Sequence, residues 1–195
     1  MTLIAETQKP EGKFRMSLAE FERLCEIQFF GEARVELLNG EVYVKGKQNP
    51  PHQQAVRYLS KLLEQTFGNK MLISAQLPLV LESPPPDYVE PDIALLALPL
   101  ETYDSRDATN QDVQLLIEIS DTTLARDQGE KLEAYARNKI LEYWILNLNA
   151  LRLEVYQEPI GLEYRRKTIY QVGQKVGFKD IEPLISWWLP ASRVN

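Results

Sequence analysis

The sequence predicts a mixed α/β (α+β) fold in which strands and helices share a mixed sheet, and three observations lead to this prediction. The chain has 195 residues, 44% hydrophobic and 26% charged, as expected of a globular protein with one substantial core. Short β-prone runs alternate with segments of helical periodicity. Residues 113–148 read as strand, helix and strand, which is long enough for one parallel crossover connection.

The N-terminal part predicts a helix and a hairpin. Residues 1–15 are expected to form a loose leader before a single domain at 16–195. Ser17-Leu-Ala-Glu20 has the pattern of a capping box, so a short helix is predicted to run to about Ile27. Asn39-Gly40 lies between two β-prone runs and predicts a hairpin at 34–45, because a type I′ turn needs positive φ at both central positions.

The middle of the chain predicts a helix, three strands, a second helix and a fourth strand. Asn49-Pro50-Pro51 interrupts the chain, and the apolar residues that follow are spaced as on an amphipathic helix. The first of the three strands contains a proline bend. Two further strands are expected after this unit as C-terminal β additions. The predicted ranges are a helix at 52–67, strands at 71–81, 90–97 and 113–120, a helix at 124–138, and strands at 142–148, 151–157 and 164–172.

The composition limits which disulfides, metal sites and membrane segments the chain can form. One cysteine, Cys25, cannot form an intramolecular disulfide, and with one histidine, His52, it cannot build a zinc finger, so any metal must be held mainly by oxygen. The longest apolar run, 93–100, is too short to span a membrane, and no signal-peptide pattern is present. A cytoplasmic location with no membrane partner is therefore expected.

The charge is unevenly distributed along the chain. The net charge is −6, which taken alone disfavours a nucleic-acid partner. Residues 151–195 carry seven Lys or Arg against five acids, so the acidic excess lies upstream. A carboxylate-rich cleft that binds divalent cations would be less negative in use than its formal charge suggests. DNA is therefore not excluded as a partner.

Two acids occupy strands that otherwise read as buried. Asp92 lies in YVEPDIALLAL and Glu118 in LLIEIS. A buried carboxylate costs several kcal/mol unless it is paired, hydrogen-bonded or bound to metal. Either acid alone could point outward or pair with an arginine, but two in neighbouring apolar strands favour a shared site. Mg²⁺ (or Mn²⁺) is bound through one or two carboxylates together with water and substrate phosphate, which matches this pair.

The sequence resembles the Uma2 family, described as restriction endonucleases, of the PD-(D/E)XK nuclease superfamily. Pro91-Asp92 followed by Glu118-Ile119-Ser120 resembles the superfamily signature, and the resemblance extends in order over roughly residues 17–160. The segments that carry it are Val35–Tyr43, Pro51–Gln53, Glu90–Asp92, Leu115–Thr122, Gly129–Ala136 and Glu142–Ile145.

The resemblance implies a restriction-endonuclease-like core of the order α-β-β-β-α-β, with an N-terminal helix and hairpin before it. It further implies a Mg²⁺-dependent endonuclease that hydrolyses phosphodiester bonds in DNA. Asp92 and Glu118 would be the metal ligands, with the backbone carbonyl of Ile119 as a third. The sequence leaves a homodimer open.

One position departs from the superfamily signature. Ser120 stands where the third strand normally carries a lysine, and it shares a strand face with Glu118, where that ammonium would reach the attacking water. The resemblance places a migrated lysine at Lys131, in the following helix, where it would orient or deprotonate the water and stabilise charge. The alternative is an exposed helix lysine paired with Glu130 or Asp127.

The remaining candidates carry weaker signals. Glu36, in the hairpin, matches a glutamate of Uma2-like sequences and has either a metal or substrate role or a solvent-facing one. His52, at the start of a helix, either packs near the surface or contacts phosphate or water. Arg165, Arg166 and Lys167 form a basic patch that would position phosphate, or that merely keeps an exposed strand soluble.

Two other functions remain compatible with the sequence. Since the third strand has no lysine, the chain could be a catalytically inactive nuclease fold that serves as a DNA-binding or protein-interaction module. It could also be a phosphohydrolase of small molecules, in which case the site should be a closed pocket rather than an open cleft. Metal binding that depends on Asp92 and Glu118 distinguishes the nuclease from the inactive module.

Overall fold

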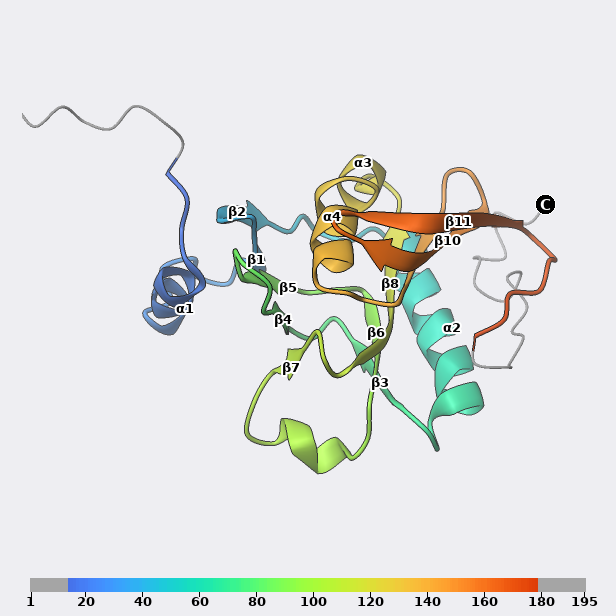
Figure 1. Cartoon of the computed structure of the whole chain (residues 1–195), viewed down its shortest axis with the longest axis horizontal. Coiled ribbons are helices and arrows are strands. Elements are labelled where there is room, and N and C mark those ends of the chain that lie inside the picture. The colour runs from blue at the N-terminus through green and yellow to red at the C-terminus, as the bar shows by residue number, and fades with distance from the viewer. Residues whose placement is uncertain (1–13, 179–195) are drawn as a thin grey trace, which may run out of the picture.

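The strands of the computed structural model, which describes residues 14–178, form two sheets (Figure 1). The six-stranded sheet has the order β11-β10-β9-β8-β6-β3, and the five-stranded sheet has the order β2-β1-β5-β4-β7. The larger sheet consists of β3 (Leu72–Ala75), β6 (Ile93–Leu96), β8 (Val113–Ser120), β9 (Glu142–Asn147), β10 (Arg152–Ile160) and β11 (Glu163–Gln171). The smaller sheet consists of β1 (Val35–Leu38), β2 (Glu41–Val44), β4 (Leu79–Leu81), β5 (Asp87–Val89) and β7 (Ala108–Thr109).

The helices flank the larger sheet, except for one that lies beside the smaller sheet. They are α1 (Leu18–Glu26), α2 (Pro50–Phe67), α3 (Leu124–Asp127) and α4 (Glu130–Arg137), with a 3₁₀ turn, η1, at Leu100–Tyr103. Along the chain, α2, β3, β6, β8, α3 with α4, and β9 reproduce the expected α-β-β-β-α-β order. The smaller sheet is built from β1 and β2, which precede this core, and from β4, β5 and β7, which lie in its connecting segments.

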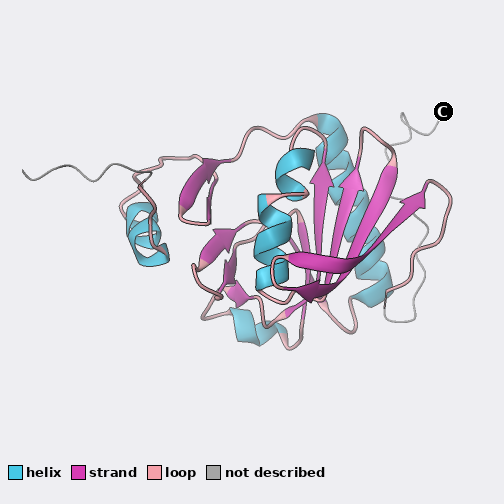
Figure 2. Cartoon of the chain, turned by 45° about the horizontal axis from the view of Figure 1, so that its top comes forward, coloured by secondary structure: helices cyan, strands magenta, loops and turns pink. Residues whose placement is uncertain are grey.

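Helices lie on both faces of the larger sheet (Figure 2), and each face has its own apolar cluster. On one face, Leu59 and Leu63 of α2 pack against Ile117 of β8 and Trp144 of β9. On the other face, Tyr135 of α4 belongs to a second cluster with strand residues of both sheets. Because side chains alternate along a strand, Glu118 faces the α4 side, opposite Ile117 and Ile119.

The predicted strand 71–81 was wrong as a single element, because the chain changes sheets within it. The segment 71–81 is β3 in the larger sheet and then β4 in the smaller one, separated at Gln76, whose φ is 56°. The segment 90–97 is preceded by β5 in the smaller sheet and yields β6 in the larger one. Pairing with distant strands decides where each strand ends, and a local pattern does not contain that information.

The N-terminal predictions are largely confirmed. The capping box is present, with the Ser17 hydroxyl and the Glu20 carboxylate bonded to each other's backbone N–H. Asn39 and Gly40 have φ of 52° and 77°, as the hairpin requires. The helix α2 begins at Pro50 rather than at 52, because Asn49 caps it and prolines are tolerated in a first helical turn.

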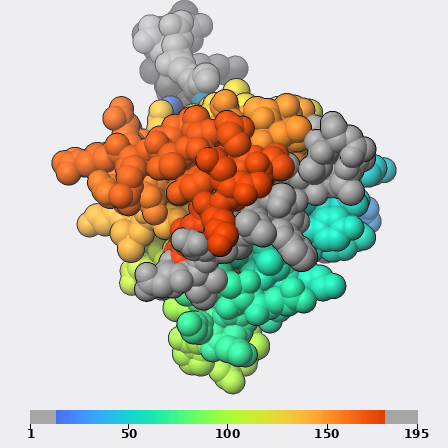
Figure 3. Space-filling model, turned by 90° about the vertical axis from the view of Figure 1, so that its right-hand side faces the viewer, coloured from blue at the N-terminus to red at the C-terminus, as the bar shows by residue number. Residues whose placement is uncertain are grey.

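The C-terminal half follows the predicted order with one break. The expected helix 124–138 is divided at Gly129 into α3 and α4. β8 and β9 form the predicted parallel pair, and β4 with β7 adds a second, two-residue one. The strands β10 and β11 pair along their whole length and cover one end of the molecule, with α2 below them (Figure 3). Residues 1–13 of the expected leader and residues 179–195 lie outside the described part of the chain.

Candidate active site

A pocket of about 240 Å³ lies where the two sheets meet. Its walls come from the hairpin β1–β2 and the loop after it, from the start of α2, from the end of β8 and from α3 and α4. The chain crosses from the smaller to the larger sheet at residues 90–92, which brings Asp92 to this junction. Five of the predicted site residues line the pocket: Glu36, His52, Asp92, Glu118 and Lys131.

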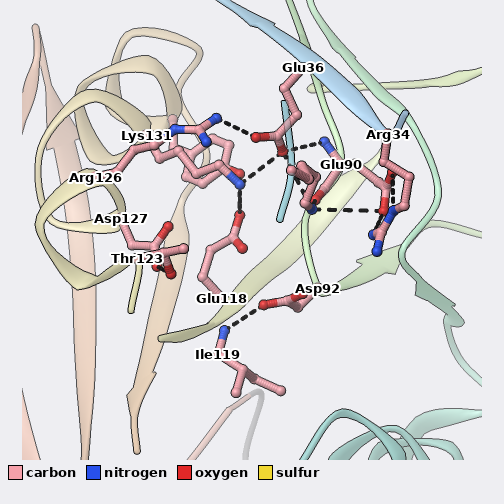
Figure 4. Close-up of polar contacts among 12 residues, drawn as sticks. Arg34, Glu36, Glu90, Asp92, Glu118, Ile119, Thr123, Arg126, Asp127 and Lys131 are labelled. Carbon is pink, nitrogen blue, oxygen red and sulfur yellow. Dashed lines mark hydrogen bonds and ion pairs between the residues drawn. The ribbon is translucent and has the colours of Figure 1, made fainter. Parts of the chain in front are cut away.

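Asp92 is held by hydrogen bonds from the end of β8 and from the start of α2. Its Oδ2 accepts a hydrogen bond from the backbone N of Ile119 at 2.8 Å (Figure 4) and another from His52 Nε2 at 3.0 Å. Burial favours the protonated acid, but the hydrogen bond from His52, the nearby charges of His52 and Lys45 and the hydrogen bond from Ile119 N together lower the pKa of Asp92. His52 therefore supports the acid directly and lines the pocket, a position compatible with the expected contact to phosphate or water.

Glu118 receives its partners from α4. Lys131 Nζ donates to Glu118 Oε1 at 2.8 Å, and the Tyr135 hydroxyl donates to the same oxygen at 2.7 Å. Burial raises the pKa of Glu118 to about 7, against the opposing charge of Lys131. In both Asp92 and Glu118 the close hydrogen bonds fall on one carboxylate oxygen, since the other Asp92 oxygen has only Gln48 at 3.5 Å.

Lys131 is a buried cation and not the exposed helix lysine of the alternative reading. It is 3% exposed and lies 2.8 Å from Glu118 Oε1 and 3.0 Å from Glu36 Oε1 (Figure 4). Burial alone would lower the pKa of Lys131, but the charges of Glu118 and Glu36 raise it well above its usual range. This lysine remains protonated at neutral pH, so it suits the stabilisation of charge and not the deprotonation of water.

Glu36 anchors the cations of the site. It is fully buried on β1, where Oε1 accepts from the Glu90 backbone N at 2.9 Å and from Lys131, and Oε2 pairs with Arg126. Burial opposes ionisation, but the charges of Lys131, Lys45 and Arg126 lower the pKa of Glu36. With both oxygens engaged, Glu36 fits a role in positioning these cations better than a role in holding a metal.

The other predicted substrate contacts are not brought to this pocket. The Ser120 hydroxyl is buried and donates to Asp127 Oδ2 at 2.6 Å, so it lies below the pocket lining. Arg165, Arg166 and Lys167 lie on the edge strand β11. Two of them pair with carboxylates there, since Lys167 lies 2.7 Å from Glu154 and Arg166 3.4 Å from Glu158.

Sequence reasoning missed Lys45, Arg126 and Asp127, which also line the pocket. The signal for Lys45 was present in the hairpin register. Glu36 pairs with Tyr43, so Lys45, two residues further on, must share their face of the hairpin. Arg126 stacks over the ring of Tyr43 at 4.2 Å, a contact that no local pattern predicts.

The donor set fits a hard divalent cation. Asp92 and Glu118 each offer a carboxylate oxygen to the pocket, and the backbone carbonyl of Ile119 directly follows Glu118 in the sequence. Among residues 14–178, no three His, Cys, Asp or Glu side chains gather as a metal site on their own. Two carboxylates completed by water and substrate oxygens are the coordination typical of Mg²⁺.

The fold places the chain in the restriction-endonuclease-like class. The structure is similar to the crystal structure of "a putative nuclease belonging to DUF820" from Anabaena variabilis, with a TM-score of 0.66 and 14% sequence identity. The match covers 89% of this chain and 99% of that one, and the shared fold is of the restriction-endonuclease-like type.

The family of the chain is identified by its match to a protein-family model. Residues 18–192 match the Uma2 model, whose description is "Putative restriction endonuclease", and the chain belongs to this family. A search of curated proteins found no match. No helix in the described residues has the length and apolar character needed to cross a membrane.

Proposed function

We propose that the protein is a Mg²⁺- or Mn²⁺-dependent endonuclease that hydrolyses phosphodiester bonds in DNA. The observation that carries the proposal is the meeting of Asp92, Glu118 and Lys131 in one pocket, although they come from three separate elements. Uma2 membership and the restriction-endonuclease-like fold support nuclease chemistry. The choice of DNA rests on the description of the family.

The acidic and the basic residues of the pocket have different roles in this proposal. Asp92 and Glu118, with the Ile119 carbonyl, would hold the cation, which when bound would polarise the phosphate and lower the pKa of a coordinated water. Lys131 opposes the rise that burial causes in the pKa of Glu118, and its positive charge acts on the reacting phosphate. His52 and the Ile119 N–H fix the direction of the Asp92 carboxylate.

The first experiment measures metal binding and cleavage together. Asp92→Asn and Glu118→Gln should abolish Mn²⁺ binding in titration calorimetry and cleavage of supercoiled and linear DNA. Asp104→Asn is the matched control, because Asp104 is exposed and lies away from the pocket lining. Circular dichroism should show an intact fold for all three variants. Unchanged Mn²⁺ affinity in both site variants would refute the metal role.

The same assays separate the alternatives. DNA binding without cleavage under any divalent metal would instead support a catalytically inactive nuclease fold. Hydrolysis of small phosphate esters without action on DNA would support a small-molecule phosphohydrolase.

Lys131 also has a kinetic test. Lys131→Met should lower the cleavage rate by about 10²–10⁴-fold, because it removes a fixed charge beside the reacting phosphate. Ser120→Lys in this background returns a lysine to the third strand and tests whether the usual position can restore part of the rate. Equal rates for wild type and Lys131→Met would remove Lys131 from the mechanism.

A further inference from the structure

The cations that line the pocket differ in how strongly the protein already holds them. Lys131 Nζ has carboxylate oxygens at 2.8 and 3.0 Å, and only 4% of its side chain is exposed. Arg126 pairs with Glu36 Oε2 and stacks on Tyr43. An incoming anion would have to compete with buried carboxylates for either group.

Lys45 is held less tightly. In the part of the chain that the structure describes, the single hydrogen bond of its ammonium runs from Nζ to the backbone carbonyl of Glu90, at 2.6 Å. The carboxylates of Glu36 and Glu90 lie 3.7 Å from Nζ, which is too far for a hydrogen bond. An ammonium has three N–H donors, so Lys45 retains donor capacity that a phosphate oxygen can use.

The Lys45 side chain is both partly exposed to solvent and held in place. It is 14% exposed, more than the side chain of Lys131, yet the Nζ of Lys45 is anchored on the Glu90 carbonyl and its backbone N on Arg34 O at 2.8 Å. Lys47, the other lysine of this wall, is exposed and so lacks a fixed direction. A lysine that is both anchored and reachable loses less conformational entropy when it binds a ligand.

The charges around Lys45 also favour the binding of an anion. Burial and repulsion from Lys131 lower the pKa of Lys45, so a bound anion would relieve an unfavourable environment. Its charge also interacts with those of Glu118 and Asp92, the two acids to which we assign the metal. A phosphate seated on that metal would thus come within the field of Lys45.

We propose that Lys45 is the side chain that binds the phosphate of the substrate in this pocket by a hydrogen bond, whereas Lys131 is ion-paired with Glu36 and Glu118 and acts on the phosphate through its charge alone. The proposal rests on the nuclease function proposed above and adds a substrate contact to it. It divides between two lysines a task that one lysine of the third strand performs in the general superfamily signature.

The test measures DNA binding separately from cleavage. A short fluorescein-labelled duplex is titrated with the full chain in Ca²⁺, and its anisotropy is followed over a range of salt concentrations. Lys45→Met should weaken binding about tenfold, as expected for a lost hydrogen bond between charged groups, and should reduce the salt slope by about one. Lys61→Met is the control, since Lys61 is exposed on α2 and outside the pocket lining.

A second measurement uses the wild-type chain and so does not depend on the folding of a variant. Bound duplex should protect Lys45, but not Lys61, from amine acylation detected by mass spectrometry. If the duplex binds, and Lys45→Met leaves affinity and salt slope unchanged or Lys45 is not protected, the Lys45 proposal is wrong and the nuclease proposal stands. If wild type neither binds nor cleaves DNA with any divalent metal, both proposals fail.

Discussion

Lys131 illustrates at the scale of single residues how one buried cation can stabilise two carboxylates. Replacing it by Met leaves Glu118, which is 3% exposed, without the lysine with which it forms an ion pair, whereas Glu36 keeps Arg126 and Lys45 nearby. Removing one partner of a buried pair costs about 3–5 kcal/mol, so Lys131→Met should lower the free energy of unfolding by that amount in urea titrations. The double variant Glu118→Gln/Lys131→Met should recover part of the loss, because it also removes the carboxylate that lost its cation. A loss below about 1 kcal/mol would mean that the buried pairs contribute little.

Glu154 gives a pH-dependent contribution away from the pocket. Its fully buried carboxylate accepts hydrogen bonds from Gln128 and Tyr156 and pairs with Lys167 and Arg152. Burial opposes ionisation, but these partners lower the pKa of Glu154 to about 2 from 4.5. Because the folded pKa is depressed, the stabilisation is complete above pH 4.5 and is lost as pH falls towards 2.

The corresponding experiment compares wild type with Glu154→Gln. Wild type should be the more stable at pH 7, by on the order of 2–3 kcal/mol, and the difference should shrink between pH 5 and pH 2. Denaturant titrations at several pH values measure it. A stability difference that does not depend on pH would assign the effect to packing instead of charge.

The hairpin β1–β2 shows at the scale of elements how one turn supports the site, since Glu36 and Lys45 both depend on its register. Gly40 has φ of +77°, and an added Cβ would lie 2.9 Å from Arg15 Cβ and 3.2 Å from Met16 O. Gly40→Ala therefore combines backbone strain with a clash. Gly161 has φ of +61° with nothing within 4 Å, so Gly161→Ala carries the strain alone.

Thermal unfolding of the two variants separates these costs. Strain at a single positive-φ position costs about 1–3 kcal/mol, and Gly40→Ala should exceed Gly161→Ala because of the additional contact. Equal melting temperatures would show that the segment around Arg15 moves aside without cost.

Elements with local signals could be predicted from the sequence, and elements defined by distant partners could not. The Ser17 cap and the Asn39-Gly40 turn are specified within a few residues, and the structure confirms both. The change of sheet at Gln76 depends on which strands lie alongside. The candidate acids Asp92 and Glu118 stood out because an acid in an apolar strand is costly. Lys45 did not, because a lysine at the end of a hairpin is ordinary until the hairpin is placed.

For the whole molecule, the fold predicts an uneven distribution of stability. The central parallel pair β8–β9 is almost entirely buried, whereas α1 buries only Phe21, whose ring lies 5.4 Å from that of Tyr88. Amide hydrogen exchange should therefore be slowest in β8 and β9, at the rate of global unfolding, and much faster in α1. Equal protection of α1 and β8 would mean that the whole chain unfolds as one cooperative unit.

Because the chain crosses between the sheets at residues 90–92, the pocket has one wall on each sheet. The wall on β1 of the smaller sheet carries Glu36, and the wall on β8 and α4 carries Glu118 and Lys131. Asp92 is attached to the wall of the larger sheet, because the backbone N of Ile119 donates a hydrogen bond to it. Loosening of the smaller sheet on heating would therefore separate Glu36 from Lys131 while the two acids remain together. Heat inactivation of this protein would then begin in a state that still holds its metal, at temperatures below those that unfold the larger sheet.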